Sequence, residues 1–289
     1  MPQRNSPPTY DGDTKVYLPD RPPRKGTHRF IYVNGIDTSP IGHQAVAEII
    51  ANITQHPVTG IYNETNGMLN DLKQCVGDWL NIVQRQIGEH GFLRDRLTQS
   101  MIDKLSKVNF QFHFWAPYAH ALREAYIAPD QIPATHTISA MQKALSRNLA
   151  SLALFDELRQ HLDRPQIVVA HSQGNLITSF ALWGLQAVYG SLGLANLQIR
   201  SISSPAPAWP RGINHQIKVY GQKDDPVTWC DPKNWSGNRS AGFWETFFRK
   251  SPGKYIKSGG IAAHSVEYNI YQTSLFKRLR ADAGIEPFH

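Results

Sequence analysis

Short runs of apolar residues recur along this chain and end at turn-forming residues. Runs bounded by Gly, Pro, Asn and Asp predict β-strands. The stretch "IVVAH" at 167–171 has the form of a strand buried on both faces. Further strands are predicted at 28–35, 108–117, 197–207, 215–222 and 254–257, whereas 59–67 is rich in turn-forming residues.

Between these runs, apolar residues recur at steps of three and four, the spacing of one face of an α-helix. The clearest case is a single long helix, predicted from Ile138 through Leu145 and Leu152 to Leu162. Helices are also predicted at 42–53, 68–106, 174–188 and 265–279. Alternating strands and helices are typical of a mostly parallel sheet with helices on both faces. The predicted fold class is therefore α/β.

The chain has 289 residues, 41% of them hydrophobic, which is enough for a large core. We expect a proline-rich strap or tail at 1–26 and one domain at 27–289, because no internal repeat or linker composition interrupts the latter. An aromatic insertion at about 229–250 is the exception to the α/β pattern. It is a candidate for a lid or cap.

Charge and cysteine content bear on the partners and the cellular location expected for this protein. The formal net charge is +7, which fits a basic soluble surface or peripheral contact with an anionic membrane. The basic runs lack a nucleic-acid recognition motif, so we expect no nucleic-acid partner. The two cysteines, the polar start of the chain and the lack of a long apolar run favour a cytoplasmic protein without signal peptide or membrane span. Leaderless export stays compatible with this sequence.

The strand at 167–171 is followed by a serine between two small residues. Ser172 has Ala170 two positions before it and Gly174 two positions after it. Small residues at these places relieve crowding where a strand turns sharply into a helix and presents a nucleophilic hydroxyl. The usual pattern is G-x-S-x-G, from which alanine is a mild departure. The alternative is an ordinary serine that caps the following helix.

A serine hydroxyl needs a base, and the chain order serine, acid, histidine supplies candidates. Asp224 and Asp225 directly follow the predicted strand at 215–222, where a carboxylate could orient an imidazole. Both also suit a turn before Pro226. His264 follows the last predicted strand and precedes the last helix, although it is one of 12 histidines in the chain.

An oxyanion hole requires two backbone N–H donors beside the nucleophile. One is expected from Gln173, the residue after the serine. The other is expected after the strand at 28–35, where Asn34 and Gly35 form a tight turn and Ile36 offers its N–H. An Asn-Gly pair is also a common plain turn.

The segments "VNGI", "AHSQGN", "KDDPV" and "AAHSVEY" together resemble the α/β-hydrolase superfamily, in particular its lipase-like and serine-esterase branches. The resemblance covers most of 28–280. It implies a Ser172–His264–Asp225 triad, with Asp224 as the alternative acid, and hydrolysis of carboxylic esters through an acyl-enzyme. It implies no cofactor, and no metal-ligand spacing is present in the sequence.

Aromatic and basic residues between the acid and the histidine are candidates for substrate binding. The aromatic side chains are Trp229, Trp235, Phe243, Trp244 and Phe247. They either complete the core or form a lid over lipid-like acyl chains. A lid would make a lipase or a phospholipase the expected kind of esterase. An acyltransferase or thioesterase would use the same triad. A non-catalytic lipid- or protein-binding module on a hydrolase scaffold is the alternative from another class.

Overall fold

The computed structural model describes residues 6–24, 26, 28–35, 38–64, 136–146, 148–204, 209–210, 213, 216–220, 265–272 and 274–285. Several predicted features lie outside these residues. They are the helix at 68–106, the strands at 108–117 and 254–257, and the aromatic insertion at 229–250.

The described core is built around a mixed sheet of six strands in the order β1-β3-β2-β4-β5-β6. Edge strand β1 is antiparallel to β3, and all the other neighbouring strands are parallel. The predicted mostly parallel sheet is thus confirmed. The strands are β1 (Thr14–Tyr17), β2 (Arg29–Val33), β3 (Val58–Ile61), β4 (Gln166–His171), β5 (Leu197–Ile202) and β6 (Ile217–Tyr220).

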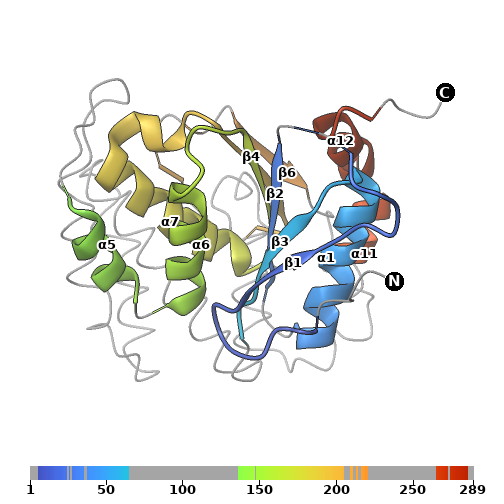
Figure 1. Ribbon diagram of the computed structural model, residues 1–289, viewed down its shortest axis with the longest axis horizontal. Coiled ribbons are helices and arrows are strands. Elements are labelled where there is room, and N and C mark those ends of the chain that lie inside the picture. The colour runs from blue at the N-terminus through green and yellow to red at the C-terminus, as the bar shows by residue number, and fades with distance from the viewer. Residues whose placement is uncertain are drawn as a thin grey trace, which may run out of the picture.

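Helices cover both faces of this sheet, as Figure 1 shows. One face carries α5 (Ile138–Leu145), α6 (Leu149–Arg159) and α7 (Gly174–Tyr189), followed by the short 3-10 helix η3 (Gly190–Leu194). The opposite face carries α1 (Pro40–Thr54), α11 (Val266–Gln272) and α12 (Leu275–Asp282). Within the described ranges, no helix combines the length and apolar character needed to cross a bilayer.

Side chains of the central strands alternate between two hydrophobic clusters. In β4, Ile167 and Val169 pack with α1 and α12, whereas Val168 and Ala170 pack with α6 and α7. Because successive side chains of a strand point to opposite faces, a run that is apolar throughout is explained by burial on both faces. The sheet is therefore the middle layer of a three-layer core.

Two strands lie where the sequence analysis predicted none. β3 overlaps the stretch at 59–67 that is rich in turn-forming residues, and β1 falls within the predicted N-terminal strap or tail. The glycine that made β3 look like a turn has a packing role. A Cβ atom on Gly60 would lie 2.4 Å from His43 Nε2, so this strand needs a residue without a side chain.

Two predicted long helices are each divided. The helix expected from Ile138 to Leu162 breaks after Leu145, and α6 starts afresh at Leu149. The break is explained by a helix cap, because Asn148 Oδ1 accepts a hydrogen bond from the backbone N–H of Ser151 at 2.7 Å. The closing helix is likewise divided into α11 and α12.

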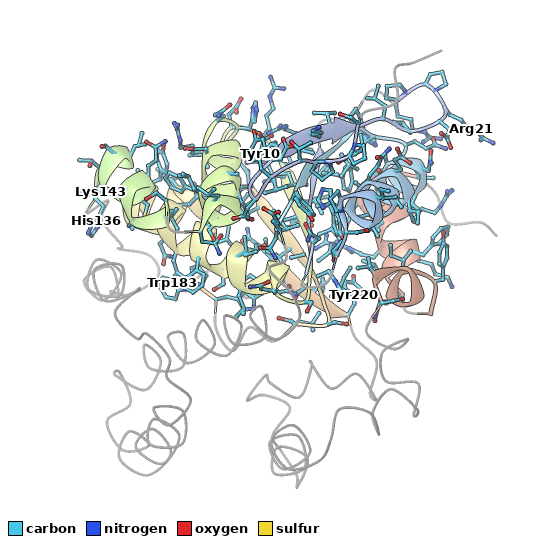
Figure 2. All side chains as sticks on the ribbon, turned by 90° about the horizontal axis from the view of Figure 1, so that it is seen from below. Tyr10, Arg21, His136, Lys143, Trp183 and Tyr220 are labelled. Carbon is cyan, nitrogen blue, oxygen red and sulfur yellow. The ribbon has the colours of Figure 1, made fainter. Side chains whose placement is uncertain are left out.

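The order of the strands reverses between β2 and β4. From β2 the chain passes to α1 and adds β3 on one side, whereas from β4 it passes to α7 and adds β5 on the other. In Figure 2, Tyr10, which precedes edge strand β1, lies above Tyr220, the last residue of the other edge strand, β6. In open α/β sheets, ligands bind where the carboxyl ends of strands meet such a reversal.

Candidate active site

Ser172 directly follows β4 at this reversal and has an unusual backbone conformation. Its φ is +51°, in the left-handed region that residues with a side chain seldom adopt. The residue is buried, with 1% of its surface exposed. An ordinary helix cap has an extended backbone, and the N-cap position of α7 is occupied by Gln173, without a side-chain cap. Ser172 is therefore not the cap of α7 but the residue at a sharp strand-to-helix turn.

Two glycines allow other segments to approach this turn closely. A Cβ atom added to Gly35, after β2, would lie 2.5 Å from Ser172 Cβ. A Cβ atom added to Gly174 would lie 2.5 Å from the carbonyl oxygen of Val33. Both distances are too short for real atoms, so both positions need glycine. The loop after β2 therefore packs directly against the Ser172 turn at Gly35.

Asn175, in the first turn of α7, holds the backbone at Ser172 in place through hydrogen bonds. The Ser172 N–H donates to the Ile202 carbonyl at 3.0 Å, which joins the ends of β4 and β5. Asn175 Nδ2 donates to the carbonyls of Ser172 and Ile202 at 3.0 and 2.9 Å, and its Oδ1 accepts from Ser201 Oγ at 2.7 Å. The whole side-chain amide is engaged, which holds the left-handed residue in place.

A chain of buried polar side chains joins the ends of β2, β3 and β4. His43 Nδ1 lies 2.8 Å from Asn34 Oδ1, which also accepts from the Asn63 N–H at 2.8 Å. Asn34 Nδ2 donates to the carbonyls of Gly35 and Asn63 at 2.9 and 2.8 Å. Asn63 Nδ2 donates to Gln173 Oε1 at 2.9 Å. This "amide chain" (Asn34, Asn63 and Gln173) therefore connects the loop after β2 with the residue that follows Ser172.

His43 is the origin of this chain and is held neutral. It is fully buried on α1 among the rings of Tyr17, Tyr32 and Tyr62. Burial lowers the pKa of His43 to about 3, against a weaker opposing effect of Asp13. Since Asn34 Oδ1 accepts, the proton of the neutral ring lies on Nδ1. His43 thus donates a hydrogen bond to Asn34 without introducing a charge.

A second set of hydrogen bonds brings the ends of β5 and β6 to the same edge. Ser203, with φ of +49°, follows β5 and donates its N–H to the Tyr220 carbonyl at 2.8 Å. Asn269 of α11 donates from Nδ2 to Ser203 Oγ at 3.3 Å and to the Ser265 carbonyl at 2.9 Å. Tyr220 and Ser265 therefore lie near the strand end beside Ser172.

The described residues include three of the predicted site residues and bring them together. Ser172, Gln173 and Gly35 meet at the carboxyl ends of β4 and β2. The other predicted residues lie outside the described residues. They are Ile36, Asp224, Asp225 and His264 of the catalytic machinery and Trp229, Trp235, Phe243, Trp244 and Phe247 of the substrate-binding set.

Asn63, His43 and Asn269 were not predicted as site residues. Asn63 follows β3, which the sequence pattern did not reveal as a strand, and His43 is spaced like any other helical residue. The one available signal was the polar character of His43 on the buried face of α1. Among the described residues, no group of three or more His, Cys, Asp or Glu could hold a metal ion.

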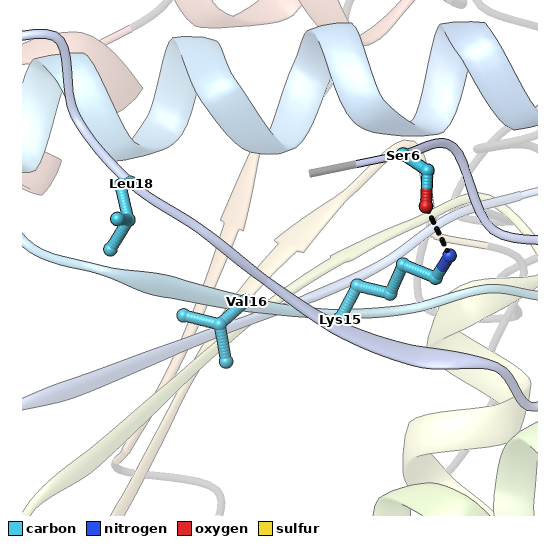
Figure 3. A pocket seen from close by; sticks show the side chains of 4 residues that line it. All are labelled: Ser6, Lys15, Val16 and Leu18. Carbon is cyan, nitrogen blue, oxygen red and sulfur yellow. Dashed lines mark hydrogen bonds between the residues drawn. The ribbon is translucent and has the colours of Figure 1, made fainter. Parts of the chain in front are cut away.

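An open pocket lies at the edge strand β1 (Figure 3). Two strands, β3 and β2, stand between β1 and β4, the strand that Ser172 follows. The pocket is lined by Ser6, Lys15, Val16 and Leu18. Lys15 Nζ donates to Ser6 Oγ at 3.0 Å and to the Pro7 carbonyl at 2.9 Å, and it lies 3.6 Å from Asp13 Oδ2. Its charge and donors are thus engaged, and the turn at Ser172 is the stronger candidate site.

Comparison with known proteins returned no match for this chain, whether among family models, curated proteins or solved structures. The residues that meet at Ser172 and their chemistry are therefore the basis for inferring a function.

Proposed function

We propose that this protein is a serine hydrolase that cleaves carboxylic esters through an acyl-enzyme at Ser172. The observation that carries the proposal is the left-handed Ser172, which lies at the turn from β4 to α7 and packs against Gly35 of the neighbouring strand loop. This combination of a strained serine, a reversal of strand order and a close second loop is typical of a nucleophile with an adjacent oxyanion hole.

The oxyanion hole is proposed to use two backbone N–H groups. Gln173 is the N-cap residue of α7, and the first N–H groups of a helix have no partners within it. They point at the reacting centre together with the positive end of the helix dipole. The second donor is proposed to be Ile36, the residue after Gly35. The contact between Gly35 and Ser172 supports this role.

His264 is proposed as the base and Asp225 as the acid that orients it, with Asp224 as the alternative. Three hydrogen bonds support this assignment. The Ser203 N–H ties the end of β6, Tyr220, to the strand end beside Ser172, and the loop with both acids follows Tyr220 in sequence. Asn269 ties Ser265, the neighbour of His264, to the same Ser203. Tyr220 and Ser265, the described residues that flank these two segments, thus lie at the nucleophile's edge of the sheet.

The proposed reaction has two halves. Ser172 Oγ attacks the ester carbonyl carbon while His264 accepts the hydroxyl proton, and the tetrahedral oxyanion collapses with release of the alcohol, which receives that proton. Water then attacks the acyl-enzyme, with His264 again as base, and the carboxylic acid leaves. The acid residue holds the imidazole tautomer and stabilises the imidazolium in both halves.

Lipid-like esters are the proposed substrate class. The aromatic residues at 229–250 and the net charge of +7 favour acyl chains presented at an anionic surface. This part of the proposal rests on the sequence and on its resemblance to α/β-hydrolases of the lipase-like and esterase branches.

The test is release of p-nitrophenol from esters of increasing acyl length by the wild type and by Ser172→Ala. We expect turnover by the wild type and its loss in the variant by at least about 1,000-fold. Ser151→Ala is the matched control, because Ser151 is also buried but lies on α6. Equal activity of the wild type and Ser172→Ala would contradict the proposal, and the preferred acyl length would separate small-ester from lipase-like specificity.

A further inference from the structure

The amide chain has a fixed direction. Asn34 is oriented by backbone groups, since the Asn63 N–H must donate to its oxygen, and the carbonyls of Gly35 and Asn63 must accept from its nitrogen. Asn63 then donates from Nδ2 to Gln173 Oε1. The oxygen of the Gln173 carboxamide is therefore engaged, and its nitrogen is left as the end of the chain.

This nitrogen, Gln173 Nε2, is buried and donates no hydrogen bond within the described part of the protein. Gln173 is 1% exposed, and its Nε2 finds no hydrogen-bond partner among the described residues. Burial of an amide nitrogen without a partner is unfavourable, and such groups in native structures call for an explanation. Gln173 directly follows Ser172 at the start of a 16-residue helix, so a bound ester is the natural acceptor.

We propose that the Gln173 side chain binds the substrate, donating from Nε2 to an oxygen of the ester, and that Asn63 is the positioning residue that orients it. This inference rests on the proposed function. It adds a side-chain donor to the backbone donor of the same residue. The acceptor is either the reacting carbonyl oxygen or a second oxygen nearby, such as the neighbouring ester group of a glycerolipid.

The test is a double-mutant cycle between Gln173 and Asn63. Gln173→Met keeps the length of the side chain and the backbone N–H but removes the donor. Asn63→Ala removes the group that orients it, and Asn63→Asp keeps the shape while removing the Nδ2 donor. Gln142→Met on α5 is the control, because Gln142 contacts Asp156 of α6 and lies outside the site.

The readouts are kcat and KM for p-nitrophenyl butyrate and for a diacylglycerol. We expect Gln173→Met to lower kcat/KM by about 10- to 100-fold, somewhat below the loss for a backbone oxyanion donor. Each Asn63 variant should lower it by a smaller factor, and the double variant should be no worse than Gln173→Met alone. Loss with both substrates assigns the carbonyl oxygen, and loss with the diacylglycerol alone assigns the second oxygen.

Two results would overturn the inference. Unchanged kcat/KM in Gln173→Met would exclude the side-chain donor, and losses that multiply in the double variant would exclude positioning by Asn63. A merely structural role of Asn63 would lower the thermal midpoint without this coupling. Asn63→Asp supplies the cycle if Asn63→Ala does not fold.

Labelling of Ser172 by a fluorophosphonate separates this inference from the proposed function. In this reaction Ser172 Oγ displaces fluoride from phosphorus, and the hydroxyl proton passes to the base. Absence of labelling and of hydrolysis in the wild type would overturn both proposals. Labelling of the wild type and of Gln173→Met at equal rates, together with equal kcat/KM, would overturn the side-chain role alone.

Discussion

The strained backbone at Ser172 points to a nucleophile only together with the contacts around it. A left-handed residue other than glycine costs about 1–2 kcal/mol, so neighbouring interactions must hold it. Ser203 has almost the same φ, at +49° against +51° for Ser172. Strain alone therefore does not single out a nucleophile. Ser172 differs because a long helix starts just after it and Gly35 packs against its Cβ atom.

His43 makes a residue-scale prediction for stability against pH. Burial lowers its pKa from 6.5 to about 3, so between these values the unfolded chain binds a proton that the folded chain does not. The free energy of unfolding is therefore unaffected by His43 titration above pH 6.5. It decreases as the pH falls from 6.5 towards 3, because protonation then favours the unfolded chain. From pH 7.5 to pH 5, we expect a loss of about 2 kcal/mol from this residue.

The measurement is urea unfolding of the wild type and His43→Gln at both pH values. Glutamine keeps a donor for Asn34 but does not titrate, so the difference between the two proteins isolates the imidazole. A difference that stays constant from pH 7.5 to pH 5 would contradict a buried neutral His43.

At the scale of elements, α12 is joined to the sheet by a buried ion pair. Arg200 of β5 donates from Nε to Asp282 Oδ2 at 2.6 Å, and both side chains are almost fully buried. Arg278 lies 2.8 Å from the other carboxylate oxygen. This cluster fixes α12 and, through it, α11, which begins just after His264. The ion pair between Arg200 and Asp282 thus helps to hold α11, whose Asn269 contacts the strand end beside Ser172.

Asp282→Ala tests this link. The substitution leaves the charge of Arg200 buried without its acidic partner, although hydrogen bonds to Gln198 and to the Ile199 carbonyl remain, so we expect a loss of about 3–5 kcal/mol in the free energy of unfolding. Asp156→Ala is the matched comparison, since Asp156 pairs with Arg159 at 2.6 Å with both side chains partly exposed. That pair should contribute at most about 1 kcal/mol, and loss of the hydrogen bond from Gln142 to Asp156 about 1 kcal/mol more. Equal losses in urea unfolding would contradict the assignment.

At the scale of the whole molecule, the two hydrophobic clusters share one sheet. β2 and β4 each contribute side chains to both clusters. Each cluster therefore packs against strands whose position also depends on the other cluster. Loss of packing on one face should therefore destabilise the same cooperative unit as loss on the other. The topology that builds this shared core also creates the reversal of strand order at Ser172.

Leu154→Ala on α6 and Ile50→Ala on α1 test whether the described core unfolds as one unit. Both side chains are fully buried, and they belong to different clusters. We expect each substitution to cost about 2–5 kcal/mol. Each should shift the same single transition, followed by circular dichroism and by tryptophan fluorescence. Separation of the two signals, or a shift in only one of two transitions, would show that the faces unfold independently.

The sequence alone determined the features that depend on local pattern. Continuous apolar runs predicted β2 and β4, three-and-four spacing predicted α1 and α7, and two small residues around Ser172 predicted its sharp turn. Local rules suffice there because burial on both faces and helical periodicity are visible within a few residues. They failed for β3, whose glycine serves a close approach to His43, and at Asn148, whose cap divides a helix that periodicity alone predicts as continuous.

Only the tertiary structure decided which distant polar residues meet. Asn34, Asn63 and Gln173 are separated in sequence by 29 and 110 positions, yet the parallel pairing of β3, β2 and β4 brings their ends to one edge. Strand order is a global property, because it depends on which helices cover which face. No local pattern contains it, and so the amide chain beside Ser172 follows from the fold rather than from any one stretch of sequence.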